Sequence, residues 1–232
     1  MRRCHQRERS RSLSAGVFAL YKYRIRQILK LQEVRNKIAR DLHDDIGSTL
    51  GSINLYSQVA NVKLSSNKQE DIKHILEKIE NSSREIIDKT GDAVWSVNPA
   101  NDLVKDLVLR MEGYAATLLG TAEIQFNIYC DEKLLDTKLK MEQRKNIFLI
   151  YKEAIHNIIK YAEATEVNIS LKKSVNKLQL IIVDNGKGFD VNENRAYNGN
   201  GLKNMKARAD EINGKINIDS KVNSGTTIEI LI

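Results

Sequence analysis

The organising stretch of this chain is Ile38-Ala39-Arg40-Asp41-Leu42-His43-Asp44-Asp45-Ile46-Gly47-Ser48-Thr49-Leu50. Apolar residues recur in and around it at spacings of three and four, which is the pattern of one buried stripe along a helix. The positions of the stripe are Leu31, Val34, Ile38, Leu42, Ile46, Leu50 and Ile53. The stretch therefore predicts a long amphipathic helix.

His43 stands beside this stripe rather than in it. It follows Leu42 and is therefore turned about 100° away from the apolar face. Its neighbours one turn away, Ala39 and Gly47, have almost no side chain, so a large group can reach the imidazole. A carboxylate such as Asp44 that accepts the proton of one ring nitrogen leaves the other a better nucleophile. The plain alternative is a polar residue at the edge of a coiled-coil stripe, and the stretch alone favours neither.

A second helix is expected after the turn-forming residues 65–68. Its stripe consists of Ile72, Ile75, Ile79, Ile86, Thr90 and Val94. Two helices with one narrow stripe each cannot bury themselves as a lone hairpin, so we expect two copies to form a four-helix bundle, and hence a homodimer. Pro99 cannot continue a helix, which places the domain boundary between residues 21–99 and residues 100–232.

Beyond Pro99, helical and alternating patterns are mixed. Helices are expected at residues 103–118, 147–158 and 202–212, and strands at 123–130, 165–172, 177–183, 215–220 and 226–232. Such a mixture predicts a two-layer α/β sandwich. The chain as a whole is therefore expected to be α+β: a long antiparallel helical hairpin followed by the sandwich.

The charge of the chain is concentrated at its start. Residues 1–40 hold twelve Arg or Lys against two Glu, a net of +10, and the whole chain carries +7, so the remaining residues carry 7 − 10 = −3. No aromatic interleaving accompanies the basic residues, so we expect no direct nucleic-acid partner. We expect residues 1–20 to be disordered or to lie against an anionic membrane face.

The composition also bears on the compartment. No run of the sequence approaches the ~20 apolar residues of a membrane span. Cys4 and Cys130 are the only cysteines, which supports no disulfide framework. A cytoplasmic protein is therefore expected.

Three segments of the second part have the chemistry of a nucleotide site. Glu153, Asn157 and Lys160 share one face of a predicted helix, and an acid, an amide and an amine suit a hydrated metal ion and phosphates. Exposed helix faces are usually only solvated, so this trio alone is weak. Residues 198–202, at the start of another helix, offer free N–H groups to phosphate. The polar residues 191–198 before them are expected to act as a lid.

The strongest segment follows the apolar run at 180–183 and reads Asp184-Asn185-Gly186-Lys187-Gly188-Phe189. A carboxylate at the end of a buried strand is costly unless it is paired, and an adenine amino group is a suitable donor. Gly186 and Gly188 permit a close approach that a side chain would block. The alternative is an ordinary Asn-Gly turn.

The order of these motifs closely resembles the ATP-binding domain shared by histidine kinases, Hsp90-type chaperones, type II topoisomerases and MutL-type repair ATPases. The matching segments are residues 152–160 for the box that bears Asn, Asp184 to Gly188, Gly199 to Leu202, and Gly225-Thr226. The first part is similar to the dimerisation and phosphotransfer helices of sensor histidine kinases of the nitrate-sensor-like subfamily, in Asp41-Leu42-His43-Asp44. The resemblance spans roughly residues 21–232.

The resemblance implies a role for each of these residues. Asn157 would ligate Mg²⁺ with Glu153 nearby, Lys160 would meet the phosphates, and Asp184 would read adenine. The segment from Gly199 to Leu202 would close on the triphosphate. The cofactor-binding residues are then Glu153, Asn157, Lys160, Asp184, Gly186, Gly188, Gly199, Gly201, Leu202 and Thr226. Two positions depart from the pattern: Ser48 replaces a Gln that is associated with phosphatase activity, and Tyr161 replaces a His.

The implied activity is that of a two-component kinase core that uses ATP and Mg²⁺. His43 would attack the γ-phosphate while Asp44 orients the ring and draws its proton. The phosphoryl group would pass to an aspartate on the receiver domain of a DNA-binding response regulator, and an upstream sensor region would place the module near a membrane. The main rival is a nucleotide-binding switch that never phosphorylates itself, such as a serine kinase or a scaffold on the same ATP fold.

Overall fold

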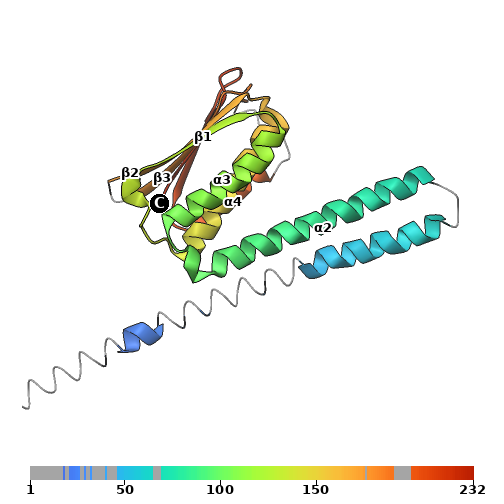
Figure 1. The fold of residues 1–232 in the computed structure, drawn as a ribbon, viewed down its shortest axis with the longest axis horizontal. Helices are drawn as coiled ribbons and strands as arrows, with labels where there is room; N and C mark the ends of the chain where they lie inside the picture. The colour runs from blue at the N-terminus through green and yellow to red at the C-terminus, as the bar shows by residue number, and fades with distance from the viewer. Residues whose placement is uncertain are drawn as a thin grey trace, which may run out of the picture. The chain divides into compact units, whose positions relative to one another are not determined.

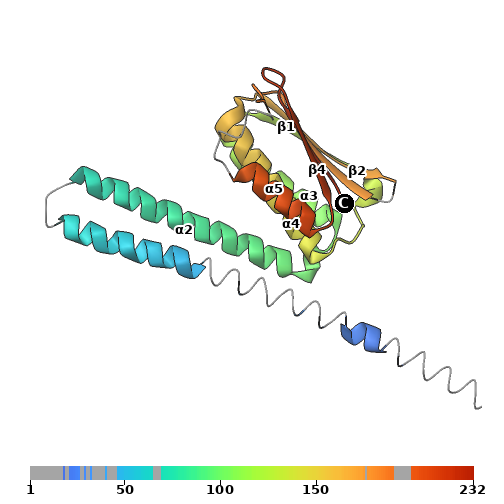
Figure 2. The same cartoon turned by 180° about the vertical axis from the view of Figure 1, so that it is seen from behind.

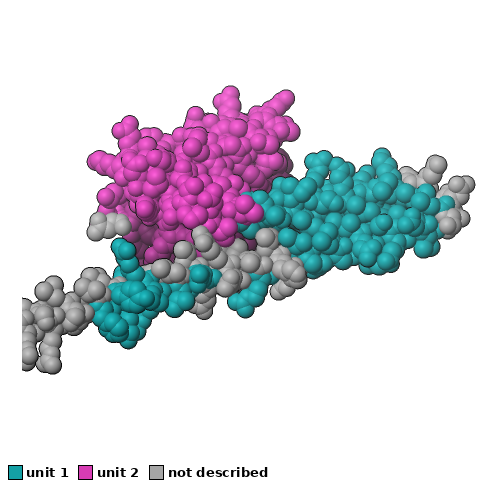
Figure 3. Space-filling view, turned by 60° about the horizontal axis from the view of Figure 1, so that its bottom comes forward, with its two compact units in different colours: residues 1–93 teal, residues 94–232 magenta. Residues whose placement is uncertain are grey.

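The computed structural model describes residues 18, 21–26, 29, 32, 40, 46–64, 69–175, 177–190 and 200–232. The chain divides into two compact units, one of residues 1–93 and the other of residues 94–232 (Figure 3). The division falls inside a helix, before the Pro99 boundary expected from sequence, because Trp95 packs against the core of the second unit. His43, Asp44, Gly199 and most of the basic start lie outside the described residues.

The first unit contains a helical hairpin (Figure 1). Residues 46–64 are helical, and the second expected helix is α2, Gln69–Val97. An ion pair of 2.7 Å between Lys63 and Asp71 joins the two helices next to their turn. The apolar stripes bury Ala60 and Ile75, each 8% exposed. Among the helices that the structure describes, none combines the length and the apolar character needed to cross a bilayer.

Many apolar side chains of the hairpin stay exposed within one copy of the chain. They are Leu50, Leu55, Val59, Val62, Leu64, Leu76 and Ile87, with Ile87 at 69%. Isolated exposed apolar residues are ordinary on a protein surface. Leu55, Val59 and Val62, at spacings of four and three, share one side of their helix, and one copy of the chain leaves this apolar side exposed.

The second unit is a five-stranded mixed sheet in the order β1-β2-β3-β5-β4. Three helices lie together on one face of the sheet, as the two opposite views show (Figures 1 and 2). The strands are β1 (Gln125–Cys130), β2 (Glu166–Ser174), β3 (Lys177–Asp184), β4 (Lys215–Ser220) and β5 (Thr226–Leu231). The helices are α3 (Val104–Thr121), α4 (Met141–Asn157) and α5 (Gly201–Glu211). The α+β architecture predicted from the sequence is confirmed.

The strand pairing explains where the second unit keeps its core. β1 and β2 are parallel, while β2–β3, β3–β5 and β4–β5 are antiparallel. In β2 and β3, alternate side chains are buried against the helical layer, as the period of two requires. They are Val167, Ile169, Leu171, Leu178, Leu180 and Ile182. The helical layer faces them with residues that include Leu107, Met111, Ile147 and Tyr151, all fully buried.

Short 3₁₀ turns complete the second unit. η1 (Pro99–Asn101) follows α2, and η2 (Glu132–Leu134) follows β1. The Tyr151 hydroxyl, deep in the helical layer, donates a 2.9 Å hydrogen bond to the Met111 carbonyl and so ties α4 to α3. Burial raises the pKa of Tyr151, which keeps this hydroxyl a donor.

We expect Met111→Ala to lower the free energy of unfolding of the second unit by about 2–5 kcal/mol, because it removes a fully buried side chain and leaves a cavity. The matched control is Leu109→Ala on the same helix, where Leu109 is 65% exposed, with an expected loss below about 0.5 kcal/mol. Urea unfolding of the full chain measures both values. Equal losses in the two variants would contradict the assignment of the core face.

Candidate nucleotide site

The helix α4 carries two of the candidate site residues on one face. Glu153 and Asn157 are four residues apart and partly exposed, whereas Ala154 and Ile155 are buried against the core. The α-helix ends at Asn157, and a π-helical turn follows as η3, Ile158–Ala162. The sequence predicts one regular helix through Lys160, so the change of helix type is a correction. Single π turns recur at functional sites.

Lys160 lies in this π turn and is exposed. Its Nζ lies 5.2 Å from the centroid of the Tyr161 ring. Lys160 is exposed, and Glu153 and Asn157 are exposed in part. The shared face expected for the three residues stays a prediction.

Gly201 brings the start of α5 against Glu153 and Asn157. A Cβ atom built on Gly201 would overlap Glu153 Oε1 and would lie 3.2 Å from Glu153 Cδ and 3.6 Å from Asn157 Nδ2. A side chain at position 201 would therefore have to push the end of the Glu153 side chain aside. The first N–H groups of a helix have no acceptors within that helix. In α5 this N-terminal end, with its partial positive charge, lies next to Glu153 and Asn157. Leu202 beside it is half-buried and packs against the core.

Asp184 ends β3 as a buried carboxylate with 6% exposure. Its Oδ1 accepts a 2.9 Å hydrogen bond from the Gly186 N–H. The backbone N–H and the hydroxyl of Thr226 also donate to it. Burial raises the pKa of Asp184, and these hydrogen bonds lower it in part. The carboxylate is thus fixed by Gly186 and Thr226, two residues that the sequence assigned to the same site.

Two glycines of this loop need conformations or spaces that other residues do not tolerate. Gly225 has a φ of +76°, and a Cβ there would overlap the Asp184 carbonyl oxygen. Gly188 has a φ of +56°, and a Cβ there would lie 2.7 Å from the Gly225 carbonyl oxygen.

Gly186 lies against the end of η3. A Cβ on Gly186 would lie 2.8 Å from Ala162 Cβ, and the Lys187 N–H donates to the Ala162 carbonyl at 2.7 Å. The loop after β3 is therefore enclosed between the β4–β5 turn on one side and η3 on the other.

The site also uses residues that the sequence did not single out. Asn185 Oδ1 accepts hydrogen bonds from the N–H groups of Thr165 at 2.9 Å and Glu166 at 3.0 Å. Ser220 Oγ accepts from the Phe189 N–H at 3.0 Å and lies 3.0 Å from the Gly225 carbonyl. Both join segments that are distant in sequence. The hint for Asn185 was its position directly after a buried strand, but Ser220 carried no local signal.

The donor set suits Mg²⁺ better than a transition metal. Within the part of the chain that the structure describes, no three His, Cys, Asp or Glu side chains gather as a metal cluster. One amide and one neighbouring carboxylate, Asn157 and Glu153, are what a hard ion needs when it keeps several waters and binds phosphate oxygens.

The geometry defines a class of protein. A mixed sheet with helices on one face, a buried aspartate between glycine turns, and a facing helix with Glu and Asn make an ATP-binding sandwich, here preceded by a helical hairpin. Two family models match the chain accordingly. Residues 142–232 match the histidine kinase-, DNA gyrase B-, and HSP90-like ATPase family, and residues 34–102 match a histidine kinase family. Together the two matches support a histidine kinase transmitter module with an ATPase domain.

Individual relatives agree with this assignment. The chain is 28% identical over 196 residues to the sensor histidine kinase YhcY of Bacillus subtilis, a match that covers 84% of this chain and 49% of that protein. This chain thus spans about half the length of that curated relative.

Solved structures of two histidine kinases share the fold. AdeS of Acinetobacter baumannii superposes with a TM-score of 0.54 at 18% identity, over 78% of this chain and 94% of that one. The blue-light activated kinase EL346 of Erythrobacter litoralis gives a TM-score of 0.53 at 16% identity, over 84% of this chain and 59% of that one.

The raised pKa of Asp184 predicts that this group makes the free energy of unfolding depend on pH. The Asp184→Asn substitution should remove that contribution. Between the ordinary value of 3.8 and the raised one, the folded state binds more protons than the unfolded state. The stability contributed by this group therefore falls as the pH rises through that window.

We expect the unfolding free energy of the unsubstituted protein to fall relative to that of Asp184→Asn as the pH is raised from about 4 to about 7. Urea unfolding without nucleotide, at several pH values, measures this difference. A difference that stays constant or rises with pH would contradict the raised pKa.

Proposed function

We propose that this module is the kinase core of a two-component system, which binds MgATP, phosphorylates its own His43 and passes the phosphoryl group to an aspartate of a response regulator. The observation that carries the proposal is the buried carboxylate of Asp184 between two glycine turns. A carboxylate that the fold keeps buried suits an N–H ligand such as the amino group of adenine.

The triphosphate would lie where α5 begins. The free N–H groups at that end favour anions, and Gly201 leaves space next to Glu153 and Asn157. Asn157 would bind Mg²⁺ with Glu153 beside it, and the ion would neutralise charge on the phosphate oxygens. Lys160 would reach the phosphates from the π turn, and Gly199 and Leu202 would flank them from the segment that enters α5.

The phosphoryl transfer uses the histidine of the first helix. A ring nitrogen of His43 attacks the γ-phosphorus, an N–P bond forms, and the bond from the γ-phosphorus to the bridging oxygen breaks so that ADP leaves. Asp44 holds the ring and accepts the proton from its other nitrogen. Base assistance of this kind is worth about 10²–10⁴ in rate. The response regulator then takes the phosphoryl group onto a carboxylate of its receiver domain.

The enzyme would act as a homodimer. The apolar side chains that one hairpin leaves exposed, such as Leu55 at 59% and Ile87 at 69%, would be buried in a bundle of four helices. Dimers and response regulator partners are general in histidine kinases, which supports both assignments. Direct nucleic-acid binding is not part of the proposal.

Incubation of the full chain with Mg²⁺ and γ-labelled ATP tests the central step. We expect label that is labile to acid and stable to alkali, as for a phosphohistidine, and its complete loss in His43→Gln. The matched control is His74→Gln, because His74 is an exposed histidine on α2 that lies 3.7 Å from Glu77. Binding of ATP with no label on His43 would favour the rival assignment, a nucleotide-binding switch.

Charges placed on the exposed apolar face should separate the dimer. We expect the double variant Leu55→Glu and Ile87→Glu to weaken self-association at least tenfold, because each buried charge costs more than about 1.4 kcal/mol. Sedimentation would then change from about twice the chain mass of 26.4 kDa to that of one chain. Glu77→Gln serves as the control, and a monomeric unsubstituted protein would refute the dimer.

A further inference from the structure

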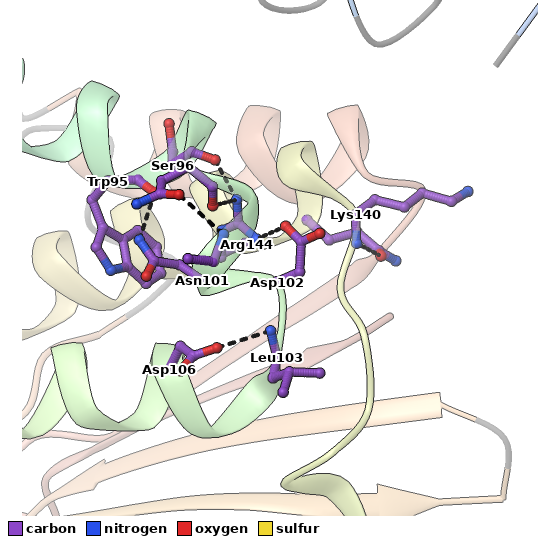
Figure 4. A network of polar contacts seen from close by, with 11 residues as sticks. Trp95, Ser96, Asn101, Asp102, Leu103, Asp106, Lys140 and Arg144 are labelled. Carbon is purple, nitrogen blue, oxygen red and sulfur yellow. Dashed lines mark hydrogen bonds and ion pairs between the residues drawn. The ribbon is translucent and has the colours of Figure 1, made fainter. Parts of the chain in front are cut away.

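A buried arginine lies at the start of α4 and reaches the end of α2. Arg144 is 1% exposed. Its Nη1 is 2.5 Å from Asp102 Oδ1, and its Nη2 donates to the carbonyls of Ser96 and, at 3.3 Å, Asn98 (Figure 4). All four residues belong to the second unit, which begins at Val94. The last turn of α2 is therefore held by this arginine.

The end of α2 explains why an arginine is needed. The last carbonyls of a helix have no partners within it, and Pro99 prevents the helix from continuing. Arg144 donates hydrogen bonds to the carbonyls of Ser96 and Asn98. Asn101 Nδ2 donates to the Trp95 carbonyl at 3.0 Å. A cation is favourable at the C-terminal end of a helix and unfavourable in the first turn of another. The charge of Arg144 therefore stabilises the C-terminal end of α2 rather than its own helix, α4.

Ring contacts fasten the same turn. The Trp95 ring centroid lies 5.7 Å from that of Phe148 on α4. The guanidinium carbons of Arg144 and Arg110 lie 5.4 Å and 4.7 Å from the Trp95 centroid. These cation–π contacts add to the contacts that the Arg144 guanidinium makes with Asp102, Ser96 and Asn98, which we call the Arg144 fork. Together they restrict the motion of the last turn of α2 relative to α4. Trp95 is also the only tryptophan of the chain, so its fluorescence reports on this contact alone.

Stability is a poor explanation for a buried charge of this kind. Replacing a buried ion pair by apolar side chains of similar volume is often neutral or stabilising. Arg144 instead links the end of α2, a helix that begins in the first unit, to α4, which carries two candidate site residues. α2 begins at Gln69 in the first unit, and α4 carries Glu153 and Asn157, with Asn157 about 20 Å from Arg144 along the helix axis.

We propose that Arg144 is a positioning residue for phosphoryl transfer, which makes the last turn of α2 and the nucleotide-binding helix α4 one rigid body. The inference rests on the proposed function. It assigns a role in phosphoryl transfer to a residue that lies away from the proposed nucleotide site. Without the fork, the nucleotide site stays whole, because its residues lie at the other end of α4. The last turn of α2, through which the chain enters the nucleotide-binding unit, would then be free to move against α4.

The test compares Arg144→Gln, Arg144→Lys and a control, Lys105→Gln, in the full chain. Lys105 makes an exposed ion pair of 3.3 Å with Asp136, so the control removes a cation of the same unit from solvent-facing surface. Three quantities are measured: the Kd for MgATP by equilibrium dialysis, the initial labelling rate at saturating MgATP, and the quenching of Trp95 fluorescence by acrylamide.

For Arg144→Gln we expect a Kd within about twofold of the unsubstituted value, a labelling rate reduced at least about tenfold, and stronger quenching of Trp95. Arg144→Lys keeps the charge but not the fork and should restore part of the rate. Lys105→Gln should match the unsubstituted protein in all three measurements.

Two results would overturn the proposal. One is an unchanged labelling rate together with unchanged quenching in Arg144→Gln. The other is an equal loss of MgATP affinity and rate that Arg144→Lys does not restore, which marks a structural role. If the unsubstituted protein never labels His43, the proposed function fails. The quenching data still decide whether Arg144 fastens α2, because unchanged quenching refutes that contact by itself.

Discussion

The site depends on the burial of one carboxylate at the end of a strand. Asp184 is 6% exposed, and the folded chain offers it donors from Gly186, in the loop after β3, and from Thr226, the first residue of β5. Those donors are in place only if Gly225 takes a left-handed conformation against the Asp184 carbonyl. The end of β3, the loop after it and the β4–β5 hairpin are thus fixed by one requirement, that a buried charge has partners.

The helix α4 joins this site to the rest of the molecule. Its exposed face presents Glu153 and Asn157 to the start of α5, and its buried face forms the core with Tyr151 and Ile155. Its first turn holds the end of α2 through Arg144. A single helix therefore contributes to the core, holds the last turn of α2 and carries the residues proposed to bind the nucleotide. A rigid helix can carry such roles because its side chains have fixed spacing and direction.

The two parts of the chain differ in how completely one copy buries its own apolar side chains. The second unit buries its apolar residues between sheet and helices, whereas the hairpin leaves Leu55 and Ile87 mostly exposed. A sandwich has two layers that cover one another, but two helices have only one shared seam. The functional cycle proposed for this family member thus combines an ATP domain that closes its own core with a hairpin that needs a second copy.

The sequence alone determined the element types, the five strands, the Asp184 loop and the face of Glu153 and Asn157, because these follow from local periods and from the cost of burying a charge. It did not predict the π turn that begins at Ile158 and contains Lys160. The bonds of Asn185 and Ser220 and the fork of Arg144 were decided by the tertiary structure. Each links segments that are far apart in the chain, and Arg144 lies before residues 147–158, where the sequence predicts the helix. Only the folded structure shows that the carbonyls of Ser96 and Asn98, at and just beyond the end of α2, lie beside it.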